Sequence, residues 1–245
     1  MFTGLVETIG VLRRRGGGAV AARALIEANL GPLSLGESIS VSGACLTVDR
    51  IAPGGFECDM SVETLARTTL GALSPGARVH LERATPLGGR MGGHMVLGHV
   101  DGIGRVIERK PEGEAVRLGV RAPAELARFL AAKGSIAIDG VSLTLNEVSA
   151  PLGGSFAFQV MLVPHTLGRT LFGELSPGAA VNLEVDVLAR YVARQLEVSV
   201  LAGTPPARHG DPERGSPDRT GAGGTDGYVD HDERLLEKLR AGGFR

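Results

Sequence analysis

The chain has 245 residues, enough for one or two domains with sizeable hydrophobic cores, which excludes a small disulfide knot. Its 26 Lys and Arg balance its 27 Asp and Glu, and a net charge of -1 makes nucleic acid and anionic lipid poor partners. With 37 Gly, 7 Phe, 2 Tyr and no Trp, the composition favours tight turns and a core of Val, Ile, Leu and Ala.

Most predicted elements are short strands. Runs that combine β-branched residues with Gly or Pro punctuation lie at 38–41, 45–48, 78–81 and 135–138. Ser-Pro-Gly at 74–76 and again at 176–178 predicts tight turns between runs that would pair. We therefore expect antiparallel β structure, as a small barrel or sandwich.

Helices are expected at few places. Pro123 suits a first turn, an apolar stripe follows at 126–130, and Gly134 suits the end of that helix. Short helical turns are expected after Thr64 and Thr166.

The C-terminal part differs in character from what precedes it. After Asp186, apolar residues at 188, 191, 192 and 196 have helical spacing, and this stripe needs a partner such as another copy of the helix. Gly, Pro and mixed charge at 203–228 predict a disordered linker. The segment 230–240 predicts a short amphipathic helix, for which a weak packing role is favoured over a function.

Three blocks of sequence occur twice in the same order. They are 36–50 with 134–147 at a spacing of 97, 64–82 with 166–184 at 102, and 2–10 with 96–104 at 94. Chance is a poor explanation for this order, so the chain is predicted to contain two tandem copies of one domain. We expect an N-terminal barrel at 1–95, a C-terminal barrel at 96–187, an oligomerisation helix at 188–202 and a flexible tail at 203–245.

Cysteine usage and the N-terminus predict a cytoplasmic protein. Cys45 and Cys58 are too few for a disulfide framework, and each lies in a strand-like stretch where a reduced, buried Cys is common. The first ten residues lack a basic region followed by a long apolar run. No segment approaches the roughly 18 apolar residues needed to span a bilayer.

Four blocks resemble the riboflavin synthases of bacteria and fungi, which are built from two lumazine-binding repeats. The blocks are FTGLVE at the start, GACLT at 43–47, GGHMVLGHVDG at 92–102 and IDGVSLT at 138–144. The resemblance covers about 1–200. It implies an all-β fold of two six-stranded Greek-key β-barrels, followed by C-terminal helices that associate into a homotrimer.

The resemblance also implies a reaction. Each repeat would bind one 6,7-dimethyl-8-ribityllumazine, at an interface between the N-terminal barrel of one subunit and the C-terminal barrel of another. One molecule would transfer a four-carbon unit to the other, yielding riboflavin and 5-amino-6-(D-ribitylamino)uracil, with lumazine synthase as a partner protein. No redox cofactor is expected, in agreement with the lack of a dinucleotide fingerprint, a P-loop or a paired CxxC.

Two histidines flank the Gly-rich junction at 92–99. A pair five residues apart with no Cys or carboxylate companion makes a weak case for a metal, and we predict none. His99 occupies the repeat position of Leu5, and an imidazole of pKa about 6.5 can shuttle protons near neutrality. The resemblance implies a catalytic or binding role for His99 and leaves His94 as a loop residue near the site.

Cys45 has Ser142 as its counterpart. Strand alternation should point Cys45 and Thr47 to one face, and Ser142 and Thr144 likewise. The alternatives are a small buried hydrophobe for Cys45 and a plain hydrogen-bonding surface for the hydroxyl pair. The implied reaction needs deprotonation of a substrate methyl group and addition of a nucleophile, so we interpret Ser142, Thr144 and His99 as a proton relay.

Asp186 is a further difference between the copies, because Ala84 stands in its place in the first. Such a carboxylate is usually solvated, but the resemblance places a site carboxylate at this position. The candidate catalytic residues are therefore His99, Ser142, Thr144, Cys45 and Asp186.

The resemblance assigns substrate binding to segments rich in backbone groups, which suit the amide edges of a flat heterocycle. In the first barrel these are Gly4, Leu5, Val6, Ser38, Cys45, Leu46, Thr47, Asp59, Met60, Ser61, Val62, Glu63 and Thr64. In the second they are Gly98, His99, Val100, Lys133, Ser142, Leu143, Thr144, Met161, Leu162, Val163, Pro164, His165 and Thr166. Phe2 and Thr3 are expected to reach a neighbouring subunit's site. Glu63 in the first copy is replaced by His165 in the second, which argues against equal affinity of the two barrels for the ligand.

Two other functions compete with the enzyme. Duplicated barrels of this kind could simply hold a lumazine or a flavin without reaction. A pure binder could lose His99, Ser142, Thr144 and Asp186 without penalty, so their presence favours the enzyme. A flavin-dependent reductase is excluded because no nicotinamide-binding α/β half follows the barrels.

Overall fold

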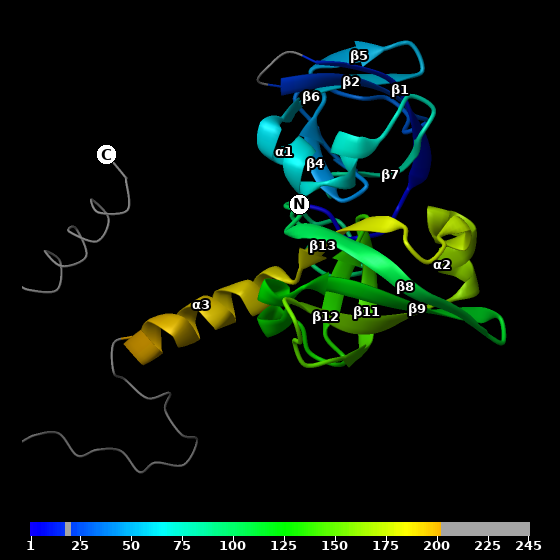
Figure 1. The fold of residues 1–245 in the computed structure, drawn as a ribbon. Coiled ribbons are helices and arrows are strands. Elements are labelled where there is room, and N and C mark those ends of the chain that lie inside the picture. Colours follow the sequence, from blue (N-terminus) through cyan, green and yellow to red (C-terminus); the bar gives the residue numbers. More distant parts are fainter. Residues whose placement is uncertain (18–20, 202–245) are drawn as a thin grey trace, which may run out of the picture. The chain divides into compact units, whose positions relative to one another are not determined.

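The computed structural model describes residues 1–17 and 21–201 (Figure 1). The linker and the terminal helix predicted within 203–245 lie outside the described residues. Within the described part, two antiparallel β units follow one another along the chain, as the repeat predicted. No helix in the described ranges is long and apolar enough to cross a membrane.

The first copy forms a seven-stranded sheet in the order β4-β3-β7-β1-β2-β6-β5. Its strands are β1 (Thr8–Gly17), β2 (Ala21–Glu27), β3 (Ser38–Val41), β4 (Ala44–Thr47), β5 (Arg50–Ala52), β6 (Gly55–Ser61) and β7 (Arg78–Arg83). The two edge strands, β4 and β5, follow each other in the chain. Between them the Asp49 amide donates to the Glu57 carbonyl at 2.9 Å, so backbone pairing with β6 begins before β5 does.

The second copy is a closed barrel in the order β10-β11-β12-β9-β8-β13. Its strands are β8 (Gly102–Glu112), β9 (Ala115–Pro123), β10 (Ser135–Ile138), β11 (Val141–Val148), β12 (Ser155–Leu162) and β13 (Ala180–Val185). The all-β prediction is confirmed.

The expectation of six strands in each copy holds only for the second. β11 stays continuous through a shift of register between Leu145 and Glu147, whereas the equivalent segment of the first copy breaks into β4 and β5. A bulge leaves one residue unpaired, so a strand can bend at a barrel corner and then resume pairing with the same partner. Both copies keep an equivalent bond at this corner, from the Val48 amide to the Glu37 carbonyl and from the Leu145 amide to the Gly134 carbonyl, each at 2.9 Å, but only in the first copy is the strand interrupted.

Each unit has its own hydrophobic core of mainly Val, Ile, Leu and Ala, as the composition predicted. A third, small cluster joins the copies. Phe2 is fully buried there beside Val96 and Ala137, and the Phe2 amide donates to the Val96 carbonyl at 2.7 Å. The expectation that Phe2 and Thr3 reach a neighbouring subunit is therefore wrong, because both are buried within this chain.

The short helices occur in equivalent pairs. These are α1 (Val62–Arg67) with α2 (Pro164–Arg169), and the 3-10 helices η1 (Thr69–Ala72) with η3 (Leu171–Glu174). α1 begins before Thr64, because the Ser61 hydroxyl caps it by accepting from the Thr64 amide at 3.0 Å. The helix predicted from Pro123 is a 3-10 helix, η2 (Ala124–Phe129), whose N-terminus has no side-chain cap.

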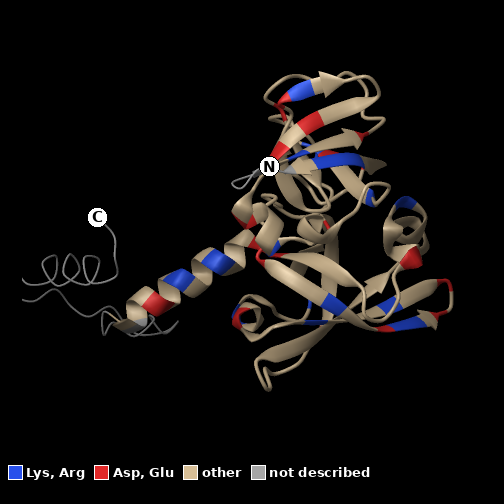
Figure 2. Cartoon of the chain, turned by 45° about the horizontal axis from the view of Figure 1, so that its top comes forward, with Lys and Arg blue, Asp and Glu red and all other residues tan. Residues whose placement is uncertain are grey.

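α3 (Val187–Leu201) confirms the predicted C-terminal helix. It begins at the end of β13 and carries exposed apolar side chains, among them Leu188, Val192 and Leu196. Figure 2 shows basic and acidic residues interspersed over the described part of the chain, in agreement with the balanced charge.

Strand β7 of the first copy contacts η3 of the second, strand β13 of the second copy contacts η1 of the first, and the two strands carry equivalent polar residues (Figure 1). The His80 ring in β7 lies 2.9 Å from the Asp139 carbonyl through Nδ1, and its Nε2 accepts from the Leu171 amide at 2.8 Å. At the equivalent position, Asn182 Oδ1 accepts from the Thr69 amide at 2.7 Å. Burial lowers the pKa of His80, so the neutral ring acts as a hydrogen-bonded link between the copies.

Candidate active site

Each copy is preceded by a short segment that lies against the other copy. The Gly98 carbonyl accepts from the Cys45 amide at 2.8 Å, and the Gly4 carbonyl accepts from the Ser142 amide at 2.8 Å. Val100 packs on the core of the first copy. The sequence-based grouping is therefore corrected, because residues 98–100 belong with the first barrel and residues 4–6 with the second.

Glycine is required at both crossing points. Gly98 and Gly4 have φ values of +79° and +78°, which side chains other than hydrogen disfavour. A Cβ on Gly98 would lie 2.5 Å from the Cys45 Cβ, and one on Gly4 would lie 2.5 Å from the Ser142 Cβ. Both the conformation and the close approach explain why glycine stands at these positions.

A cavity of about 280 Å³ lies beside the first crossing. Its walls come from β4, from α1 with its flanks, and from the segment 98–100. It gathers predicted site residues from both copies, namely Cys45, Ser61, Glu63, Thr64, Gly98, His99 and Val100. The first site is thus built at the junction of the two copies within one chain.

The predicted strand alternation holds in β4. Cys45 is half-buried and Thr47 is exposed, whereas Leu46 between them is buried in the core. Cys45 and His99 therefore contribute a thiol and an imidazole to the same cavity. The pairing of Cys45 with His99 differs from the predicted relay, which joined His99 to Ser142.

Ser142 lies beside the other histidine. Its Oγ is 2.6 Å from His94 Nδ1, and His94 Nε2 is buried with no hydrogen-bond partner among the described residues. Burial lowers the pKa of His94, and the nearby Asp186 carboxylate opposes part of that effect. A neutral imidazole that carries its proton on Nε2 can accept the Ser142 hydroxyl proton, so this pair can act as a general base.

Asp186 connects this second site to α3. Its Oδ1 accepts from the Leu188 amide at 2.9 Å, which caps the helix, while its charge acts on His94. The role of His94 was missed because its partner Ser142 is 48 residues away in the sequence. One signal was present, since Gly93 directly before it permits a close approach and a Cβ there would lie 2.9 Å from Ser142 Oγ.

Comparison with known proteins identifies the family. A model of the Lumazine binding domain matches residues 3–84 and 97–186. The riboflavin synthase of Brucella abortus is 45% identical over 201 residues, covering 79% of this chain and 97% of that protein. The riboflavin synthase of Mycobacterium bovis is 44% identical over 200 residues, with 79% and 97% covered. The chain belongs to the riboflavin synthase family.

A solved structure with lower sequence identity to this chain has a similar fold. LumP complexed with riboflavin has a TM-score of 0.66 and 26% identity, and the match covers 76% of this chain and 99% of LumP. That structure holds riboflavin bound to LumP.

The residues assigned from the riboflavin synthase resemblance differ in how accessible their side chains are. Leu46, Met60, Leu143 and Leu162 are buried in the cores, so only their backbone groups could contact a substrate. Others have exposed or half-buried side chains: Leu5, Ser38, Val62, Thr144, Met161, Val163, Pro164, His165 and Thr166. Lys133 is exposed, with φ +70°, and its amide donates to the Leu145 carbonyl at 2.7 Å.

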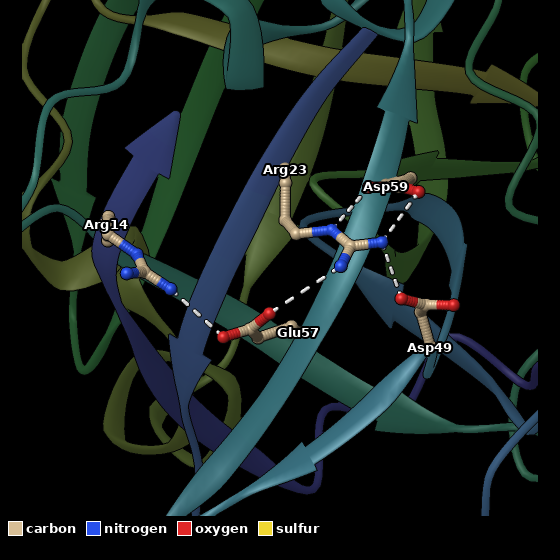
Figure 3. Close-up of polar contacts among 5 residues, drawn as sticks. All are labelled: Arg14, Arg23, Asp49, Glu57 and Asp59. Carbon is tan, nitrogen blue, oxygen red and sulfur yellow. Dashed lines mark hydrogen bonds and ion pairs between the residues drawn. The ribbon is translucent and has the colours of Figure 1, made fainter. Parts of the chain in front are cut away.

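Asp59 belongs to a network of charges on the first barrel (Figure 3). Arg23 donates to Asp59 at 2.9 and 3.1 Å and to Asp49 at 2.6 Å. The guanidinium also lies 3.9 Å from Glu57, which pairs with Arg14 at 3.0 Å. The hydrogen bond from Arg23 lowers the pKa of Asp59 and keeps it ionised.

This network distinguishes the two lumazine-binding copies. The positions of Asp49, Glu57 and Asp59 hold the uncharged residues Asn146, Gln159 and Met161 in the second copy. Arg23 has its counterpart in Arg117, which pairs with Glu112 instead. The repeat alignment contained this signal.

Proposed function

We propose that this member of the riboflavin synthase family converts two molecules of 6,7-dimethyl-8-ribityllumazine into riboflavin and 5-amino-6-(D-ribitylamino)uracil. One molecule transfers a four-carbon unit to the other. The observation that carries the proposal is the 45% identity to a riboflavin synthase over 97% of that protein's length. The two lumazine-binding domains supply one site for each of the two reacting molecules.

The polar groups of the second site suit proton transfer. The reaction needs a base to remove a proton from a substrate methyl group. His94 and Ser142 lie 2.6 Å apart in a partly buried site, and Asp186 supports the positive charge that His94 acquires on taking up a proton. Thr144 points to the same side of β11 as Ser142 and adds a hydroxyl to the set.

The first site has a different set of groups. Cys45 and His99 line its cavity with Thr64 and the capped end of α1. Backbone amides and carbonyls of the crossing segments suit the amide edge of the lumazine ring. Neither site needs a metal or a redox cofactor in this proposal, because the same compound serves as donor and acceptor.

The assembly and its surroundings are part of the proposal. The domains are taken as 1–95 and 96–187, followed by an oligomerisation helix at 188–202 and a tail at 203–245. The exposed apolar side chains of α3 support association into a homotrimer in which sites of neighbouring subunits face each other. We place the enzyme in the cytoplasm, with lumazine synthase as the protein that supplies its substrate.

An assay with purified full-length protein tests the function. The protein is incubated with 6,7-dimethyl-8-ribityllumazine in the presence of a chelator and without nucleotide. We expect riboflavin to form at one molecule for every two lumazines consumed. Binding of lumazine with no riboflavin formed would instead identify a non-catalytic lumazine- or flavin-binding protein.

A further inference from the structure

Two buried glutamates occupy equivalent positions in the strands that join the copies. Glu82 in β7 and Glu184 in β13 lie 102 residues apart, and each is only 4% exposed. In the described ranges neither carboxylate has a Lys, Arg or His partner in an ion pair. A buried carboxylate with no counter-ion must be stabilised by hydrogen bonds.

These hydrogen bonds come from the crossing segments. Glu184 Oε1 accepts from the Leu97 amide at 2.7 Å, and its Oε2 accepts from the Gly98 amide at 3.0 Å. Glu82 Oε1 accepts from the Thr3 amide at 2.6 Å and from the Thr3 hydroxyl at 2.7 Å. Glu82 Oε2 accepts from the Gly4 amide at 3.0 Å. Each carboxylate thus uses both oxygens to hold one segment.

The held segments are the ones that enter the opposite sites. We propose that Glu184 is a positioning residue for the first site, which holds residues 97–99 so that Gly98 bonds to Cys45 and His99 lines the cavity. Glu82 has the same role for residues 3–5 at the second site. The catalytic consequence of this positioning rests on the proposed function. The positioning itself is a property of the folded chain and can be tested without any activity.

Only a side chain with two accepting oxygens can hold the 97–99 segment in the way that Glu184 does. Two backbone N–H groups converge on Glu184, and both need acceptors. A glutamine of the same shape has one accepting oxygen, and its NH2 group would face the second N–H donor. Because the position is buried, water is not available to replace the lost bond, and the segment should be released.

The thiol of Cys45 reports directly on this release. Cys45 is half-buried beneath the 98–100 segment, whereas Cys58 is buried in the core and burial raises its thiol pKa to about 12. An alkylating reagent such as iodoacetamide should therefore react with Cys45 and leave Cys58 unmodified in the folded protein. Peptide mass analysis distinguishes the two sites of modification.

The experiment compares Glu184→Gln with Glu82→Gln in the full chain. We expect Glu184→Gln to raise the alkylation rate of Cys45 by about tenfold or more, from the loss of one of the two hydrogen bonds that hold the segment. Glu82→Gln, which loosens the other segment, should leave that rate within about twofold of wild type. Riboflavin titration should show one weakened site in each variant. Unchanged Cys45 reactivity in Glu184→Gln, or equal increases in both variants, would overturn the proposal.

Global unfolding has its own signature, because it exposes Cys58 as well. If Glu184→Gln unfolds, Glu184→Asp becomes the test, since it keeps both accepting oxygens on a shorter side chain. Faster alkylation of Cys45 alone would then support the proposal, and simultaneous alkylation of Cys58 would reduce Glu184 to a structural role. A wild-type protein that forms no riboflavin would refute the proposed function and leave this result intact.

Discussion

Replacing Gly98 with alanine should lower both the stability of the protein and the riboflavin affinity of the first site. The loss should exceed the cost of placing a side chain at a left-handed backbone position. Gly98 has φ +79°, and its carbonyl accepts the Cys45 amide at 2.8 Å. The added Cβ would lie 2.5 Å from the Cys45 Cβ and 2.8 Å from the Cys45 amide nitrogen. Carbon atoms in ordinary contact are about 3.5 to 4.0 Å apart, so the segment would have to move by about 1 Å.

The expected magnitude has two parts. A left-handed conformation costs an L-residue with a side chain about 1–2 kcal/mol. Loss of the hydrogen bond between Cys45 and Gly98 adds about 1 kcal/mol. The free energy of unfolding should therefore fall by about 2–3 kcal/mol, which lowers Tm by about 4–12 °C for a chain of this size.

Gly76→Ala is the matched control. Gly76 has φ +93°, but a Cβ there would meet no atom within 4 Å. This variant should lose only the conformational part, about 1–2 kcal/mol. Urea unfolding gives the two free energies, and riboflavin titration gives the affinities of the sites. We expect one site to weaken by about tenfold or more in Gly98→Ala, corresponding to about 1.4 kcal/mol, and neither site in Gly76→Ala.

The reasoning would be refuted by two results. If both variants lost the same free energy within about 0.5 kcal/mol, the contact between Gly98 and Cys45 would carry no stability. If riboflavin affinity were unchanged in Gly98→Ala, the crossing segment would not form part of the first site.

Three further predictions concern single side chains. Because the folded pKa of His80 is lowered by burial, the unfolded chain binds a proton first, and stability should be lost as pH falls below about 6.5. His80→Asn, which installs the residue found at position 182, should show a smaller loss between pH 6.5 and 5 in urea unfolding, and an equal loss would count against this link. Ser142→Ala removes the partner of His94 and should lower kcat more than riboflavin affinity; equal losses would make Ser142 pocket lining only. Cys45→Ser keeps the backbone bond to the crossing segment, so riboflavin affinity should stay within about threefold, and a larger loss would show that the thiol itself contacts the ligand.

Much of the fold could be predicted from the sequence because its signals are local. Strand alternation, Ser-Pro-Gly turns and the helical spacing after Asp186 each depend on neighbouring residues, and the repeat extended these signals to two copies. The break between β4 and β5 could not be predicted in this way. Both copies share the bond that Val48 and Leu145 donate at this corner, and the difference lies in the pairing just after it, where β11 continues through a register shift and the first copy does not.

For the candidate site, too, the sequence predicted some features and not others. The sequence identified Cys45, His99 and Ser142 as chemically relevant residues, but it grouped each with its own copy. The cavity with Cys45 and His99, and the pair of Ser142 with His94, arise from contacts between distant parts of the chain. Such contacts have no periodic signature in the sequence.

By itself, the sequence determined a duplicated β protein with two sets of polar site residues and a C-terminal helix. Only the tertiary structure decided that the segments before the copies are exchanged. The physical reason is that two buried carboxylates, Glu82 and Glu184, need backbone donors, and the glycines Gly4 and Gly98 allow those segments to approach the opposite barrel closely. Donors and acceptors that satisfy one another lie about 80 residues apart, at the two ends of one copy, so their pairing exists only once the strands of that copy have folded.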